Sequence, residues 1–104
     1  MGYANFGAKT SLQLQRHIRT ISANTSSIVI TIHASARMKD RRVSRGEVFE
    51  CLRHGVIRKI PEPDLAKGSL TCRMEHYIAG RDCAVVVALA DETPDVIVVT
   101  VMIV

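Results

Sequence analysis

Two apolar runs near the C-terminus constrain the fold of this chain more than any other feature. Residues 83–90 (CAVVVALA) and 96–104 (VIVVTVMIV) are almost continuously apolar, and the polar connector 91–95 separates them. Runs of this length, rich in β-branched residues, predict strands that are covered on both faces. Helices of the chain would cover one face. The other face needs the N-terminal helix, a partner subunit or a partner protein.

The rest of the chain predicts helices mixed with shorter strands. Residues 69–78 alternate apolar and polar side chains, which predicts a strand, and Gly80-Arg81-Asp82 predicts the hairpin turn after it. Shorter strands are expected at 28–32 and 56–60, and helices at 12–22 and 34–41. A third helix begins at Ser44, where Glu47 completes a capping box, and ends at Gly55 in a left-handed C-cap. We therefore expect an α+β fold, with a single domain over 1–104.

The cysteines and the termini bear on compartment and cofactors. Cys51, Cys72 and Cys83 have no C-x-x-C spacing and fall on apolar stripes, which predicts core residues in a reducing cytoplasm. The N-terminus lacks the apolar core of a signal peptide, and the run 96–104 is too short to span a bilayer. We expect a soluble, cytoplasmic protein that uses no membrane, metal or cofactor.

The charges of the two halves differ. Residues 1–60 carry eleven Lys/Arg and three Asp/Glu, whereas residues 61–104 carry three and seven. The basic half either attracts polyanions or is simply a solvated helical surface. Outside the motif described next, the basic positions expected to contact nucleic acid are Arg42, the Arg45-Gly46 pair, Arg53 and Arg73.

The motif that suggests chemistry follows the apolar run 28–32. His33, Arg37 and Arg41 are spaced i, i+4 and i+8, so they share one side of the predicted helix. His33 either caps this helix or acts as a general acid or base near neutral pH. The two arginines could bind a phosphate. Such a set suits metal-free attack of a ribose 2′-hydroxyl on its own phosphodiester.

A second group of polar residues is predicted on the sheet. Thr100 interrupts the last apolar run, and it is either inert or presents a hydroxyl to a site. Arg73, Glu75 and Tyr77 share one face of the neighbouring strand and could line a cleft with it. Arg73 and Glu75 could equally form a same-face ion pair of little energetic consequence.

Over residues 28–104 the sequence resembles the bacterial family called domain of unknown function 4258. The family pattern is a strand, then H-A-x-x-R-M-x-x-R-x-[IV]-S, a helix ending in glycine, and a last pair of apolar strands with a threonine in the second. Here the pattern is carried by His33-Ala34, Arg37-Met38, Arg41, Val43-Ser44, Arg53-His54-Gly55, Arg81-Asp82 and Val99-Thr100-Val101. Arg42 stands where the family usually has glycine. Residues 27–104 form the family-like core, and residues 1–26 form a helical N-terminal extension.

The family looks like the small toxins and ribonucleases that include RelE-like and colicin-type RNases. That relation implies two or three helices packed on a four-stranded antiparallel β-sheet, as in RelE and barnase, and metal-independent cleavage of RNA. By position it implies His33, Arg37, Arg41 and Thr100 as catalytic residues. We expect RNA as the substrate, a cognate antitoxin or immunity protein as a partner, and a homodimer as a candidate assembly.

Two other functions compete with the ribonuclease-type toxin. One is a non-catalytic inhibitor or adaptor from a mobile element, which binds a nucleic-acid-handling protein through the basic surface. The other is a small dimer-forming domain in which the motif only ties a helix to the sheet. The sequence leaves open whether the protein is an enzyme.

Overall fold

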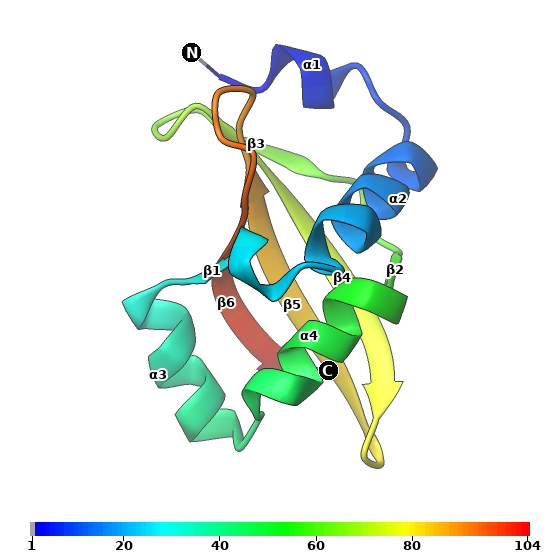
Figure 1. The fold of residues 1–104 in the computed structure, drawn as a ribbon, viewed down its shortest axis with the longest axis vertical. Helices are drawn as coiled ribbons and strands as arrows, with labels where there is room; N and C mark the ends of the chain where they lie inside the picture. The colour runs from blue at the N-terminus through cyan, green and yellow to red at the C-terminus, as the bar shows by residue number, and fades with distance from the viewer. Residues whose placement is uncertain (1) are drawn as a thin grey trace.

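The fold is built on one mixed sheet of six strands (Figure 1), in a computed structural model that describes residues 2–104. The long strands β4 (Ser69–Ile78), β5 (Arg81–Leu89) and β6 (Val96–Ile103) form an antiparallel meander. Two short strands, β2 (Val56–Ile57) and β3 (Glu62–Asp64), both pair with β4. The edge strand β1 (Ile28–Ile30) pairs in parallel with β6, so the sheet order is β1-β6-β5-β4-β2.

The expected four-stranded antiparallel sheet is therefore wrong in strand number and in one pairing. β3 has the sequence Glu62-Pro63-Asp64, which carries no apolar alternation and reads as a loop. It forms only because it lies against the first residues of β4. β1 and β6 are joined through most of the chain, and a connection of that length permits parallel pairing. The α+β class itself is confirmed.

Two helices cover one face of the sheet. In Figure 1, α2 (Ser11–Ser22) and α4 (Arg45–His54) lie in front of the strands, and α3 (Ile32–Arg41) lies beside β6. The short helix α1 (Ala4–Gly7) sits near one end of the sheet, and the 3₁₀ turn η1 (Thr25–Ser27) leads into β1. Within residues 2–104, no helix combines the length and apolar character needed to cross a bilayer.

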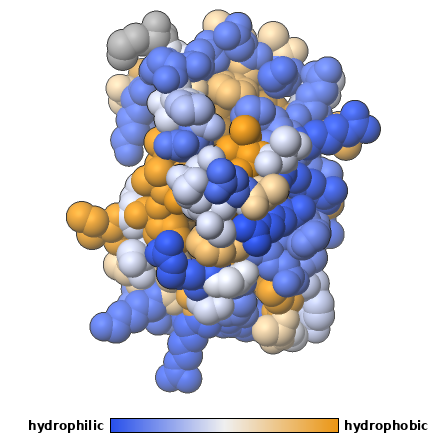
Figure 2. All heavy atoms as spheres, in the orientation of Figure 1, coloured by the Kyte–Doolittle hydropathy of each residue, from blue (hydrophilic) through white to orange (hydrophobic). Residues whose placement is uncertain are grey.

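The edge strand β1 exposes apolar side chains. Val29 is 41 % exposed, and Ile32 at the start of α3 is 92 % exposed. Figure 2 shows hydrophobic atoms gathered in this part of the surface, around β1 and the start of α3. The segment 27–32 contains neither a charged residue nor a proline, the devices that usually protect a sheet edge.

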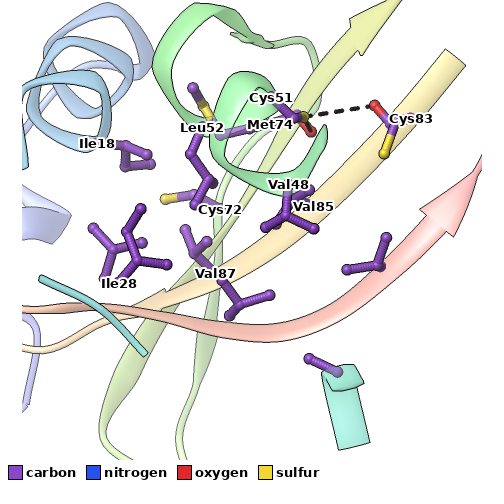
Figure 3. Close-up of a cluster of buried hydrophobic side chains, with 14 of the residues drawn as sticks. Ile18, Ile28, Val48, Cys51, Leu52, Cys72, Met74, Cys83, Val85 and Val87 are labelled. Carbon is purple, nitrogen blue, oxygen red and sulfur yellow. Dashed lines mark hydrogen bonds between the residues drawn. The ribbon is translucent and has the colours of Figure 1, made fainter. Parts of the chain in front are cut away.

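The core lies between the helices and the sheet. α2 contributes Leu14 and Ile18, which are almost completely buried, although both precede the family-like core. Besides Ile18 of α2 and Ile28 of β1, the residues labelled in Figure 3 come from α4 and from one face of the long strands: Val48, Cys51, Leu52, Cys72, Met74, Cys83, Val85 and Val87. Burying a side chain of this size contributes about 1.5–3 kcal/mol.

The other face of the sheet has no helix over it in the part of the chain that is described. Residues that alternate with the core positions point this way, among them Thr71, Arg73, Val86 and Met102. Thr100 pairs with Val86 in the register that includes Ala84 and Met102, so Thr100 also faces this side, and the shift between Val86 and Val87 comes after this pair and leaves Val99 without a register partner. We call it the open face. The N-terminal helices do not cover it, so that option for the second face is wrong.

Two local expectations need correction. Gly55 ends α4, but its φ of −73° is not left-handed. A Cβ at this position would lie 2.3 Å from the carbonyl oxygen of Cys51 and 2.9 Å from that of Glu75, so glycine is needed for close approach. The hairpin turn between β4 and β5 consists of Ala79 and Gly80, both at positive φ, and Arg81 already belongs to β5.

Candidate functional site

The first turn of α3 is held by Thr31, which leaves His33 free for another role. Thr31 Oγ1 accepts a hydrogen bond from the Ala34 N–H at 3.1 Å and donates one to the Val98 carbonyl at 2.9 Å. This is an N-cap that also fixes the helix to β6. The capping role that the sequence left open for His33 is therefore wrong. His33 follows two residues later, and its side chain is exposed.

His33 lines a pocket of about 440 Å³, which we call the His33 pocket. The floor is apolar and comes from the ends of two paired strands, with Ala88 opposite Ile97 in the register. Ala90 and Val99 extend this floor. The rim is polar and comes from three separate segments: Thr31 and His33, Lys67 and Ser69, and Glu92 and Thr93. An apolar floor with a few converging polar groups is the usual form of a ligand site.

Two rim residues, Lys67 and Ser69, were not predicted from the sequence. Lys67 lies in the turn between β3 and β4, where its N–H donates to Asp64 Oδ1. Ser69 is only 6 % exposed, and its hydroxyl has no hydrogen-bond partner within residues 2–104. A single lysine in a turn and a serine at the start of a strand carry no sequence signal. Only the fold brings them to His33.

Thr100 lies on the open face but does not line the His33 pocket. Its register partner Val86 borders a second pocket of about 200 Å³, together with Lys59, Thr71 and Arg73. The two pockets adjoin, because Thr71 of the second pairs with Ala88 of the first. Thr100 is therefore close to the site without being part of its wall.

Arg73 is already paired in this second pocket. Its Nε lies 3.2 Å from Glu75 Oε2, and both side chains are mostly buried. The same-face ion pair that the sequence left open is thus present. Most of the charge of Arg73 is compensated by Glu75, so it is a weak candidate for phosphate binding.

The two arginines of the motif follow His33 along α3. Arg37 is on the next turn, and its Nη2 forms an ion pair with Asp40 Oδ2 at 2.6 Å. Arg41 is two turns on, so its Cα lies about 12 Å from that of His33 along the helix axis. The structure therefore does not gather the three side chains around one point. Arg37 is the nearer cation, and Arg41 belongs to the other end of the helix.

Several other arginines hold helix ends together. Arg81 donates to the carbonyl oxygens of Arg41 and Arg42 at 2.7 and 2.8 Å, so it caps the end of α3. Arg53, an expected RNA contact, donates to the Ser22 carbonyl at the end of α2 at 2.7 Å. In return, Arg19 of α2 donates to the Gly55 carbonyl at the end of α4. Part of the basic charge is thus used in the fold.

The remaining positions that the sequence predicts to contact nucleic acid lie around the loop between α3 and α4. Arg42 is the C-cap of α3 in a left-handed conformation with φ of 55°, which explains why glycine is usual there. The guanidinium of Arg45 lies 5.5 Å from the centre of the Phe49 ring. Gly46 has no side chain to offer a ligand. Arg42 and Arg45 are exposed, but they lie beyond the end of α3 that is far from His33.

The cysteines are core residues, as predicted. All three are buried free thiols. In Figure 3, Cys51 Sγ donates to the carbonyl oxygen of Cys83, at 3.8 Å. Burial raises the pKa of Cys72 to about 12, so this thiol stays protonated at neutral pH.

The comparisons with known proteins identify one family. The family model described as a domain of unknown function, DUF4258, matches residues 24–103. No curated protein and no solved structure matches the chain. The match begins just before β1 and includes the His33 pocket, α4 and the three long strands, but not α1 and α2. The chain therefore belongs to the DUF4258 family.

Proposed function

We propose that the protein acts on RNA as a metal-independent ribonuclease, with His33 as its acid/base group. The observation that carries the proposal is the place of His33. It is a titratable side chain on the rim of a pocket, relieved of a structural role by Thr31, with Lys67 on the same rim. The resemblance to RelE-like and colicin-type RNases supports the same reaction, and so does the basic character of residues 1–60.

The reaction needs one proton acceptor, one cation and a bound phosphodiester. Neutral His33 takes the proton of the ribose 2′-hydroxyl while the 2′-oxygen attacks phosphorus. The bond from phosphorus to the 5′-oxygen breaks, and the leaving oxygen takes a proton from water. The products are a 2′,3′-cyclic phosphate and a free 5′-hydroxyl. Lys67, on the rim of the pocket, stabilises the charge on the phosphoryl oxygens. Arg37, from the next turn of α3, joins it only by exchanging Asp40 for the phosphate.

The roles expected for Arg41 and Thr100 are narrower in this proposal. Arg41 contributes to long-range attraction of the RNA rather than to the scissile phosphate, because it lies two helical turns away. Thr100 lies opposite Val86, which borders the adjoining pocket, and in this proposal it contacts a neighbouring part of the substrate.

The test compares His33→Ala with the wild-type protein on a mixed-sequence single-stranded RNA in the presence of EDTA. We expect wild-type cleavage that EDTA does not reduce, and a loss of about 10²–10⁴-fold in the variant. His54→Ala removes another exposed histidine and serves as the control. His33→Gln gives a second reading if the alanine variant folds poorly. Equal cleavage by wild type and folded His33→Ala, or none by the wild type, would refute the ribonuclease.

A second candidate function is favoured by the unprotected edge at β1. Val29 and Ile32 are exposed next to the basic helix α3, whose Lys39 and Arg41 are also exposed. An acidic, extended segment of a nucleic-acid-handling protein would complement both features by adding a strand to this edge. In that case the protein is an inhibitor or adaptor, as the alternative interpretation of the sequence has it.

The two functions respond to different substitutions. For the adaptor, Ile32→Ser and Val29→Lys abolish capture of the partner, and His33→Ala leaves it intact. For the ribonuclease the pattern is reversed. Sedimentation of the pure protein shows whether a second copy occupies the β1 edge instead, as a homodimer would require.

A further inference from the structure

The His33 pocket has features that a simple phosphate site does not need. Its floor consists of four apolar residues with short or branched side chains on two adjacent strands: Ala88, Ala90, Ile97 and Val99. The floor therefore offers a broad apolar surface on the open face of the sheet. A phosphate alone would leave this surface unused, whereas a ligand with a flat apolar face would cover it.

Ser69 adds a second, independent observation. It is more than nine-tenths buried, lies in the pocket wall, and has a hydroxyl without a hydrogen-bond partner in residues 2–104. A buried hydroxyl without a partner is costly, and such groups in native proteins usually have a reason. The hydroxyl both donates and accepts, and because its oxygen is itself covered, a change of side-chain rotamer brings it to the polar edge of a ligand that lies on the apolar floor.

The charged groups stand on the same rim. Lys67 and His33 come from segments on either side of the pocket, the turn before β4 and the first turn of α3. Glu92 is the acidic residue of the rim, and its carboxylate accepts a weak hydrogen bond from the Gly2 N–H at 3.4 Å. The rim thus offers the ammonium of Lys67 and the imidazole of His33 for one anionic group, beside a hydrogen-bonding edge and an apolar floor.

We propose that the His33 pocket binds one nucleotide of the RNA, with its base on the apolar floor, its polar edge at Ser69, and its phosphate between His33 and Lys67. This inference rests on the proposed function and deepens it. A base can enter such a pocket only when it is unstacked and unpaired, so the substrate is single-stranded RNA. Contact with the base edge makes cleavage depend on the base that occupies the pocket.

The test measures binding of small probes to the wild-type protein by calorimetry or NMR, since none of the probes contains an internucleotide bond that the protein could cleave. The probes are the four nucleoside 3′-monophosphates, the corresponding nucleosides, ribose 5-phosphate and inorganic phosphate. We expect at least one mononucleotide to bind ten times or more tightly than its nucleoside and than ribose 5-phosphate. The four mononucleotides should differ among themselves, because their edges differ.

Variants in the pocket locate the binding. Ala90→Leu fills the floor and should abolish mononucleotide binding, and Ser69→Ala should weaken it about tenfold and flatten the preference among bases. Met102→Leu, on the same face but in the second pocket, should leave mononucleotide binding unchanged, because a single nucleotide occupies only the His33 pocket. Ala88→Val is a milder filling variant, to be used if Ala90→Leu is unstable.

The outcomes separate the inference from the proposed function. RNA cleavage without mononucleotide binding, or binding that Ala90→Leu leaves intact, overturns the nucleotide pocket and spares the ribonuclease. Equal affinity for inorganic phosphate and for mononucleotides also overturns it. Mononucleotide binding without any RNA cleavage supports the pocket and refutes the ribonuclease. In that last case a comparison with short oligonucleotides shows whether the ligand is a free nucleotide or RNA.

Discussion

The two ends of α3 lie in one sequence motif but are used differently. At the first turn, the hydroxyl of Thr31 satisfies the backbone and leaves His33 at the rim of a pocket. At the last turn, the guanidinium of Arg81 binds two backbone carbonyls, and Arg42 adopts a left-handed conformation to let the chain turn. One end has a side chain free for a ligand. At the other, the polar groups are engaged in the fold.

This difference separates residues that look alike in the sequence. A motif with a histidine and several arginines suggests one site, and the helical spacing supports that interpretation. Yet Arg81, Arg53 and Arg19 each donate to carbonyls at a helix end. Arg37 and Arg73 are paired with carboxylates. A basic residue in this domain therefore does not indicate a binding site unless its partners are known. The polar side chains around His33 that are not engaged in the fold indicate one more directly.

The largest effect is expected at the C-terminal end of α3, where the polar groups are engaged in the fold. Arg81→Ala removes two charge-assisted hydrogen bonds and should lower the free energy of unfolding by about 2 kcal/mol. Urea denaturation measures this. Arg81→Lys should recover little of it, because an ammonium cannot span two carbonyls as the guanidinium does. Arg16→Ala, exposed on α2, is the control and should stay within about 0.5 kcal/mol. If Arg81→Ala loses no more free energy of unfolding than Arg16→Ala, Arg81 does not stabilise the end of α3.

The sequence predicts the surroundings of the C-terminal end of α3 better than those of its N-terminal end. Apolar periodicity and the Ser44–Glu47 capping box place α4 and the long strands almost where they lie, because these signals act over a few residues. The signals for β3 and for the parallel pairing of β1 are absent, since both depend on contacts distant in the chain. The same holds for the site. His33 was found from its motif, whereas Lys67 and Ser69 reach it only through the β3–β4 turn.

The next largest effect on stability is expected at the N-terminal end of α3, at Thr31. Thr31→Val removes both hydrogen bonds of the hydroxyl and should destabilise the fold by about 1 kcal/mol. Because the cap fixes the first turn, mononucleotide binding at the His33 pocket should weaken as well. Thr31→Ser keeps the hydroxyl and should restore most of both. If Thr31→Val binds and unfolds like the wild type, the cap does not position His33.

A smaller effect, this time an increase in stability, is expected from a substitution at Arg42. A residue with a Cβ at φ of 55° is strained, so Arg42→Gly should raise the free energy of unfolding by about 0.5–1 kcal/mol. Arg42→Ala keeps the strained φ and should give no such gain, which separates backbone strain from the loss of charge. The hairpin residue Ala79 at φ of 53° provides a parallel case, in which Ala79→Gly should stabilise to a similar extent. A gain in Arg42→Ala equal to that in Arg42→Gly would assign the effect to charge.

The smallest effect is a pH dependence of stability, which comes from Glu47 near the C-terminal end of α3. The hydrogen bond from the Ser44 N–H, helped by Arg81, holds the pKa of Glu47 below its ordinary value of 4.5. A carboxyl with a lowered pKa in the folded state stabilises the fold above pH 4.5, and this contribution is lost as the pH falls through the folded pKa. Glu47→Gln keeps an acceptor for the Ser44 N–H but cannot titrate. The stability difference between wild type and variant should therefore be constant near neutral pH and should shrink below pH 4.5. Chemical denaturation at a series of pH values measures it, and a difference that stays constant down to pH 3 would mean that Glu47 is not held by these partners.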